Sequence, residues 1–242
     1  MSVIVVIPTY NEADNIVPLC KALLSLALEL EILIVDDASP DGTGELAQEL
    51  ADTECKIRVI HRAEKLGLGT AYTHGLNWAL ENTNANLIAQ MDADFSHDPT
   101  SLPSLVEVAT RNTIAVGSRY VMGGGIKNWG LGRRFLSKAA NLYVRTILSL
   151  PIADVTGAFR CWPRCILSKI DLSSVQASGF AVLPEMLFRA KHQGFSITEV
   201  PIIFEERRVG QSKLTLGIAV ESFSNVWYLR WRKLSRHADL SP

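Results

Sequence analysis

Short β-branched segments alternate with longer helical segments along the first part of the chain. Strands are expected at residues 3–7, 31–35, 57–60 and 87–91. Apolar residues at helical spacing fill the intervals, with one helix expected to run through Leu30, a second over 43–52 and a third ending near Leu80. Strands separated by helices of this length pair in parallel, so we expect an α/β fold whose mostly parallel sheet carries helices on both faces.

The later part of the chain continues this pattern less regularly. It predicts a strand at 114–117, a basic helix at 133–148, a helix beginning near Pro184 and a strand at 198–201. No internal repeat or linker separates these segments. We therefore expect a single domain over residues 1–215, followed by an amphipathic C-terminal helix and tail over 216–242.

The composition is that of a globular protein. A hydrophobic content of 48% and a net charge of -1 exclude a disordered or nucleic-acid-coating chain, so nucleic acid is not an expected partner. No basic region or cleavage site precedes the first strand, and no uncharged apolar stretch reaches about 18 residues. We therefore expect a cytoplasmic protein without a signal peptide or a spanning helix.

Unusual polar loops follow the predicted strands. They read PTYNE (8–12), DDASPDGT (36–43), KLGLGTA (65–71) and DADFSHDP (92–99). In an open parallel sheet, ligands bind outside the carboxyl ends of the strands, where such loops meet. The third loop has neither the Walker spacing nor GxGxxG, so a P-loop ATPase or a dinucleotide enzyme is not expected.

The acidic residues after the second strand allow two interpretations. Asp41 stands near the start of a predicted helix, where a carboxylate caps free amides and complements the helix dipole. Asp37 stands at a strand end, where we expect no helix amide for it to bind. Its carboxylate is suited to accept from a ribose hydroxyl or a base N–H.

Asp92 and Asp94 place two like charges at the end of a buried strand. Like charges this close repel each other unless a cation or solvent compensates them. An Asx-type turn running into His97 and Asp98 is one interpretation. The other is a site for Mg²⁺ or Mn²⁺, which needs only one or two protein carboxylates when substrate phosphates complete the shell.

Basic residues stand in three later segments. Arg119 follows a strand, and Arg207 and Lys213 stand in a polar loop. Arg133 and Ser137 are spaced i, i+4 and share one helix face. Their helix also carries Arg134, Lys138 and Arg145, and this positive field suits an anionic group.

Taken in order, the motifs resemble those of family 2 glycosyltransferases. They are PTYNE, VDDASPDGT, LGLGTAY, MDADFSH, GSRY, the basic helix and VTGAFR, and they cover about residues 3 to 215. The chain looks most similar to dolichol-phosphate (polyprenol-phosphate) mannose synthases. The resemblance implies a GT-A (Rossmann-like) fold and inverting transfer of mannose from GDP-mannose to a dolichyl or polyprenyl phosphate, with Mg²⁺ or Mn²⁺.

Residue roles follow from the matching positions. The resemblance assigns the guanosine part to Pro8, Tyr10, Glu12, Val35 and Asp37. It assigns the pyrophosphate and metal to Asp92, Ala93 and Asp94, with Ser96 as a further metal contact. Arg119, Arg207 and Lys213 would contact the donor diphosphate, and Arg133 and Ser137 the acceptor phosphate.

Catalysis would rest on Asp94, Arg119 and Arg133, and we expect no catalytic base because the acceptor phosphate is already anionic. Two alternatives stay open. One is a glucosyltransferase that uses UDP-glucose and a polyprenyl phosphate. The other is a non-catalytic sugar-nucleotide-binding subunit of a membrane complex.

A lipid acceptor requires access to a membrane surface. Apolar residues follow one helical face near the C-terminus, namely Leu216, Val220, Phe223, Trp227, Trp231 and Leu234. Basic residues cluster beside them, namely Arg230, Arg232, Lys233 and Arg236. This pattern fits a helix packed on the domain or an interfacial helix on anionic headgroups at the cytosolic face, and anchoring by a partner protein is also open.

Overall fold

The computed structural model describes residues 1–175, 179–206 and 226–231. The main sheet has seven strands in the order β3-β2-β1-β4-β7-β5-β8. These are β1 (Val3–Thr9), β2 (Leu30–Asp36), β3 (Ile57–His61), β4 (Leu87–Gln90), β5 (Thr113–Ser118), β7 (Arg160–Pro163) and β8 (Ser196–Pro201). All neighbours pair in parallel except β7, which runs antiparallel to both β4 and β5. The predicted mostly parallel sheet is confirmed.

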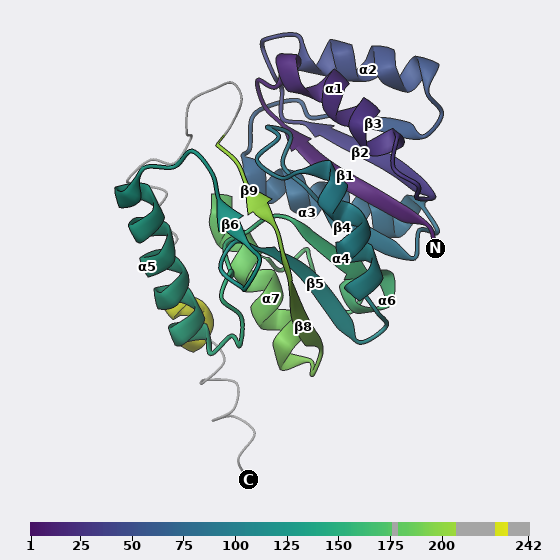
Figure 1. Cartoon of the computed structure of the whole chain (residues 1–242). Coiled ribbons are helices and arrows are strands. Elements are labelled where there is room, and N and C mark those ends of the chain that lie inside the picture. The colour runs from purple at the N-terminus through teal and green to yellow at the C-terminus, as the bar shows by residue number, and fades with distance from the viewer. Residues whose placement is uncertain (176–178, 207–225, 232–242) are drawn as a thin grey trace.

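Helices cover both faces of the sheet (Figure 1). One face packs against α1 (Ala13–Leu24), α2 (Thr43–Thr53) and α4 (Leu102–Val108). The other packs against α3 (Leu68–Asn82), α6 (Arg164–Leu167), α7 (Val182–His192) and part of α5 (Leu131–Leu148). Short 3-10 turns, η1 (Pro99–Ser101) and η2 (Gly179–Ala181), precede α4 and α7.

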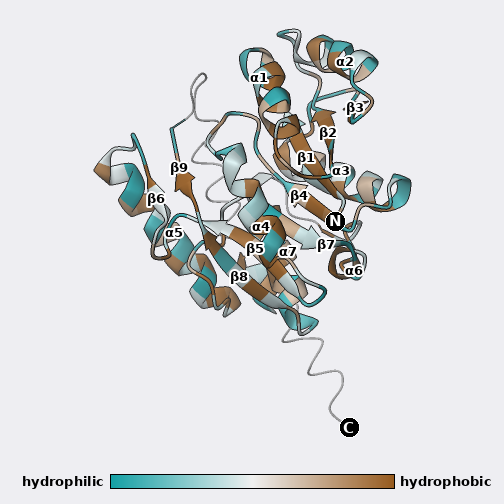
Figure 2. Ribbon diagram, turned by 45° about the vertical axis from the view of Figure 1, so that its right-hand side comes forward, coloured by the Kyte–Doolittle hydropathy of each residue, from teal (hydrophilic) through white to brown (hydrophobic). Residues whose placement is uncertain are grey.

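The alternation of side chains along each strand supplies both faces of the core. Within β1, Ile4 and Val6 point into one cluster, while Val5 and Ile7 point into the other. Both faces are therefore apolar, and β1 and β4 show as hydrophobic strands in Figure 2.

A smaller sheet lies beside the main one. It pairs β6 (Gly125–Ile126) in parallel with β9 (Ile203–Phe204). Helix α5 follows β6 and stands at the outer edge of the molecule in Figure 1. This position matters because α5 carries the predicted acceptor residues.

Two expectations about elements are wrong. The first helix ends at Leu24 and does not run through Leu30. Leu26, Leu28 and Leu30 are more buried than the residues between them, so their apolar pattern has a period of two and leads into β2. Strand β7 was not expected, because its first residue is an arginine and its last a proline.

The predicted C-terminal helix lies mostly outside the described residues. Residues 226–231 are helical. Val226 is buried and Leu229 packs against the core, whereas Trp227 and Trp231 are exposed. The two tryptophans therefore do not pack on the domain as a buried face.

Gly75 tests how closely α3 approaches the sheet. A Cβ on Gly75 would lie 2.5 Å from Val6 Cγ1 and 2.8 Å from Val35 Cγ2. We expect Gly75→Ala to lower the free energy of unfolding by about 1–3 kcal/mol through overpacking, despite the better helix propensity of alanine. Urea unfolding measures the change.

The matched control is Gly132→Ala in α5, where a Cβ would meet nothing within 4 Å. This control should be neutral or slightly stabilising. If both variants were equally stable, α3 would not pack as closely as described.

Candidate active site

The polar loops converge at one edge of the sheet. Parallel register pairs Thr9 with Asp36 and Asp36 with His61, so β1, β2 and β3 end side by side. The loops after these strands therefore face the same space, as expected for a ligand-binding edge.

Asp36 and Asp41 hold these loops together. The Asp36 carboxylate accepts from Thr9 Oγ1 at 2.9 Å and from Ser39 Oγ at 2.6 Å. Asp41 accepts from the backbone N–H of Thr43, the first residue of α2, at 3.1 Å. The predicted capping role of Asp41 is confirmed.

Asp37 has partners that the sequence did not suggest. Its buried carboxylate pairs with Arg62 Nη1 at 2.6 Å and accepts from the backbone N–H groups of Leu66 at 3.0 Å and Gly67 at 2.7 Å. Both amides belong to the loop that leads into α3, because the helix begins at Leu68. Asp37 therefore fixes the loop between β3 and α3.

The other predicted guanosine contacts lie around the end of β1. Tyr10 is half-buried, and Lys65 Nζ lies 3.7 Å from the centroid of its ring. Glu12 is buried and accepts from Asn15 Nδ2 at 2.9 Å. The Val35 side chain is fully buried in the core, so only its backbone could meet a nucleotide.

The loop after β4 has the geometry of an Asx turn. Asp94 Oδ1 accepts from the backbone N–H of Ser96 at 3.0 Å, and Phe95 between them has a positive φ of 58°. Asp92 Oδ1 accepts from the Tyr72 hydroxyl at 2.7 Å. Burial, together with the Asp92 charge, raises the pKa of Tyr72 well above its ordinary value, so this hydroxyl stays a donor.

His97 also stabilises the loop after β4. It is buried and its ring stacks on Phe159 with 5.1 Å between centroids. Its Nδ1 accepts from the backbone N–H of Asp92 at 3.4 Å. Burial lowers the pKa of His97 even though Asp92 and Asp94 act to raise it, so the ring is a neutral acceptor at neutral pH.

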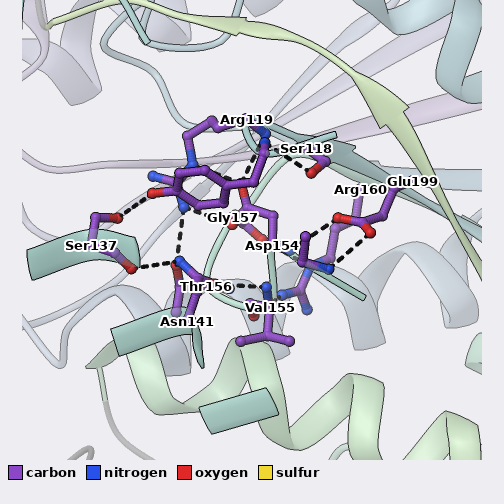
Figure 3. Close-up of polar contacts among 12 residues, drawn as sticks. Ser118, Arg119, Ser137, Asn141, Asp154, Val155, Thr156, Gly157, Arg160 and Glu199 are labelled. Carbon is purple, nitrogen blue, oxygen red and sulfur yellow. Dashed lines mark hydrogen bonds and ion pairs between the residues drawn. The ribbon is translucent and has the colours of Figure 1, made fainter. Parts of the chain in front are cut away.

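Arg119 is held by a carboxylate that the sequence analysis did not single out. Its Nε and Nη2 each lie 2.7 Å from an oxygen of Asp154, which is fully buried (Figure 3). Burial acts to lower the pKa of Arg119, but the neighbouring Asp154 carboxylate raises it, and the net result is a pKa above the ordinary value. Glu199 in turn accepts from the backbone N–H of Asp154 at 2.9 Å. In the sequence, the only indication of this role is that Asp154 is the first residue of the DVTGAFR segment.

The predicted acceptor residues lie on one face of α5. Ser137 Oγ accepts from the Tyr120 hydroxyl at 2.7 Å. Arg133 pairs with Glu206 at 2.9 Å and lies 4.0 Å from the centroid of the Trp129 ring. The Arg133–Glu206 pair is solvent-exposed, so it contributes little to stability and can exchange for another anion.

Asn141 connects α5 to the loop before β7, and the sequence analysis missed it. Its Oδ1 accepts from the backbone N–H groups of Val155 at 2.8 Å and Thr156 at 3.2 Å. Its Nδ2 donates to Thr156 Oγ1 and to the Ser137 carbonyl, both at 3.0 Å (Figure 3). An amide four residues after Ser137, on the same helix face, was the signal in the sequence.

Arg160 holds the same loop from the sheet. It is fully buried and donates to the carbonyls of Gly157 and Val155, both at 2.9 Å, and of Leu183 at 2.6 Å. Burial lowers the pKa of Arg160 to about 9. The loop 154–157 is therefore fixed from both sides, by α5 and by β7.

Residues 4–171 match the family model for glycosyl transferase family 2. The chain belongs to this family. It is 42% identical to the polyprenol monophosphomannose synthase of Mycolicibacterium smegmatis, over 95% of this chain and 88% of that protein. It is 40% identical to the undecaprenyl-phosphate mannosyltransferase of Micrococcus luteus, over 99% of this chain and 100% of that one.

Solved structures show the same fold as this glycosyltransferase. Glucosyl-3-phosphoglycerate synthase of Mycobacterium tuberculosis, solved with Mn²⁺ and UDP, superimposes with a TM-score of 0.68 at 18% identity and covers 95% of this chain and 79% of its own. The mannosyltransferase of Pyrobaculum calidifontis, solved with GDP-Man and Mn²⁺, superimposes with a TM-score of 0.63 at 20% identity. The match covers 97% of this chain and 64% of that protein. The predicted GT-A fold is confirmed.

The residues of the DADFSH loop fit a divalent cation of the kind seen in those structures. Ser96 Oγ is buried and has no hydrogen-bond partner among the described residues. It lies beside Asp94, to which its own backbone N–H donates. Among the described residues no group of three or more His, Cys, Asp or Glu could hold a metal. Two carboxylates and a hydroxyl are hard oxygen ligands that suit Mg²⁺ or Mn²⁺ when a diphosphate supplies the rest.

Two of the predicted donor contacts are not placed. Arg207 and Lys213 lie outside the described residues. Ala93, between the two carboxylates, is buried.

Asp94→Asn tests the cation site. Losing the carboxylate charge should lower glycosyl transfer by about a hundredfold, because metal stabilisation of the leaving group supplies several kcal/mol. Electron paramagnetic resonance of Mn²⁺, recorded with and without a nucleoside diphosphate, should show weaker binding.

The matched control is Asp98→Asn, an exposed residue whose carboxylate caps η1, a position where asparagine caps equally well. Thermal melting checks that both variants fold. Wild-type Mn²⁺ affinity and activity in Asp94→Asn would remove the metal role from this residue.

Proposed function

We propose that this glycosyltransferase transfers mannose from GDP-mannose to a dolichyl or polyprenyl monophosphate, with inversion, giving polyprenyl-phosphate mannose and GDP. The observation that carries the proposal is the cationic face of α5 beside the end of β5, where Ser137 contacts Tyr120 and Arg133 is half-exposed. The two curated relatives, named for polyprenol and undecaprenyl phosphate, support this acceptor class.

The chemistry suits the residues present. An oxygen of the acceptor phosphate attacks the anomeric carbon while the carbon–oxygen bond to GDP breaks. A phosphate monoester is already anionic at neutral pH, so no general base has to remove a proton. The barrier lies in bringing two anions together, and positioned cationic groups such as Arg119 and Arg133 lower it.

The donor side uses the loops at the ends of β1, β2 and β4. We assign the guanosine part to Pro8, Tyr10, Glu12, Val35 and Asp37, and the diphosphate to Asp92, Ala93, Asp94 and Arg119, with Arg207 and Lys213 closing over it. Asp37 acts by shaping the loop before α3, since its carboxylate is bound to that loop. Asp92, Asp94 and Ser96 would hold a divalent ion, which would supply positive charge for the leaving GDP.

An apolar face of α5 supports binding to a membrane surface. Leu131, Phe135 and Leu142 are 83%, 76% and 61% exposed and are spaced i, i+4, i+11. They lie opposite the buried face of Asn141 and Val144. One lysine and three arginines lie on the same helix, which suits anionic headgroups.

Residues 226–231 offer further exposed aromatic side chains. Trp227, Tyr228 and Trp231 are all more than half exposed. In the described part of the chain no helix has the length and apolar character needed to cross a bilayer. As part of the proposed function, we place this enzyme on the cytosolic face of a membrane as a peripheral protein, with the exposed apolar side chains of α5 and residues 226–231 toward the lipid.

Arg133→Ala tests the acceptor assignment. Losing a charge-assisted contact to phosphate should raise KM for the lipid phosphate by about tenfold to a hundredfold, or about 1.5–3 kcal/mol. KM for GDP-mannose should change little, because the donor binds at the other loops. Initial rates of lipid labelling, with each substrate varied in turn, measure both constants.

Lys56→Ala, an exposed cation that precedes β3 at the other end of the sheet, serves as the control and should leave both constants near wild type. An equal rise in both KM values for Arg133→Ala, or a rise for GDP-mannose alone, would contradict the acceptor assignment.

The double change Phe135→Ser and Leu142→Ser tests the membrane surface. Sedimentation with anionic vesicles should show a smaller bound fraction, because each side chain loses apolar area that enters the interface. Since both residues are exposed, the melting temperature should stay unchanged. Activity on a short, water-soluble prenyl phosphate should also stay unchanged, whereas activity on long-chain lipid in vesicles falls.

Trp227→Ser with Trp231→Ser should act in the same direction. Leu66→Ser, an exposed leucine in the loop before α3, is the control and should bind vesicles normally. A vesicle-bound fraction that none of the changes alters would exclude these faces as the membrane surface.

A further inference from the structure

The hydroxyl of Thr156 lies at the junction between Arg119 and helix α5. Thr156 belongs to the loop before β7 and is half-buried. Its Oγ1 lies 3.0 Å from Arg119 Nη2 and 3.0 Å from Asn141 Nδ2 (Figure 3).

The direction of both hydrogen bonds is fixed. An arginine guanidinium can only donate. The Asn141 amide is oriented by the backbone N–H groups of Val155 and Thr156, which can only donate and therefore face Oδ1. Nδ2 consequently faces Thr156 Oγ1 and the Ser137 carbonyl, and donates one hydrogen to each.

The number of lone pairs on Thr156 Oγ1 limits the further hydrogen bonds that this hydroxyl can make. A threonine hydroxyl has two acceptor lone pairs and one O–H donor. Arg119 and Asn141 fill both lone pairs, so the O–H must point away from them. Among the described residues no acceptor lies within hydrogen-bond distance of it. Thr156 therefore keeps one O–H donor that none of the described residues uses.

The neighbours of this donor favour an anion. Arg119 donates from Nε to Asp154 and from Nη2 to both Asp154 and Thr156. Its Nη1 makes no hydrogen bond to the described residues. Ser137, predicted to bind a phosphate, shares the Asn141 amide with Thr156. A guanidinium edge and hydroxyl donors held on one rigid network bind phosphate oxygens well.

We propose that Thr156 is a substrate-binding residue whose hydroxyl donates to a phosphate oxygen held between Arg119 and Ser137. The inference rests on the proposed function, which supplies two sources of such an oxygen: the acceptor monophosphate and the donor diphosphate. The network fixes the donor before the ligand arrives, so little reorganisation is needed on binding.

The experiment compares Thr156→Val with Thr156→Asp and Thr156→Ser. Valine keeps the shape and removes the hydroxyl. Aspartate still accepts from Arg119 and Asn141, so a purely structural role would be preserved, but it cannot donate and it repels phosphate. Serine keeps both functions. Thr146→Val, an exposed threonine of α5 whose hydroxyl bonds only within its helix, is the matched control.

Two constants are measured for each variant: the KM for a short prenyl phosphate, and the Kd for GDP by calorimetry with Mn²⁺. We expect Thr156→Val and Thr156→Asp to weaken one of them by about tenfold or more, and Thr156→Ser to restore most of the loss. A raised KM identifies the acceptor phosphate, and a raised Kd the donor diphosphate.

Unchanged KM and Kd in variants that melt as cooperatively as wild type would overturn the proposal. So would a Thr156→Asp variant with wild-type constants, because the hydroxyl would then act only as an acceptor. The proposed function is tested separately, by mannosyl transfer with the wild-type enzyme. The Kd for GDP does not depend on transfer, so it still tests Thr156 if the wild-type enzyme shows no transfer to a prenyl phosphate.

Discussion

The buried pair of Arg119 and Asp154 is the interaction on which the proposed acceptor side depends. Asp154 is fully buried and binds Arg119 through both carboxylate oxygens, so removing either partner would leave an uncompensated charge, at a cost of about 3–5 kcal/mol. The pair joins the end of β5 to the loop before β7. Thr156 and Asn141 extend the connection to α5, which places Ser137 beside Tyr120.

The donor side is built differently, from carboxylates at strand ends. Asp37 fixes the loop before α3 through Arg62 and two backbone amides, and Asp92 is fixed by the Tyr72 hydroxyl. Asp92 and Asp94 tolerate each other in the proposed mechanism because a divalent ion and the loop's own donors compensate their charge. In the proposed mechanism, Arg119 connects the donor loops with the acceptor residues of α5.

The sequence predicted most of the sheet because hydrophobic period is a local property. The strands around Val5, Leu33 and Ala115 and the loops that follow them could be read directly. Partners distant in sequence could not: Asp37 binds Gly67, and Arg119 binds Asp154, through contacts that only the topology creates. Strand β7 was not predicted because its buried Arg160 donates to the carbonyls of Val155, in the preceding loop, and of Leu183, which is distant in sequence.

The central claim is that one site brings a GDP-linked mannose to a lipid phosphate. The most direct measurement incubates the purified protein with radiolabelled GDP-mannose, a polyprenyl phosphate and Mn²⁺, then extracts the lipid into organic solvent. The account predicts label in the organic phase that requires both the polyprenyl phosphate and the cation. Label that stays in the aqueous phase, or transfer that occurs only from UDP-glucose, would contradict it.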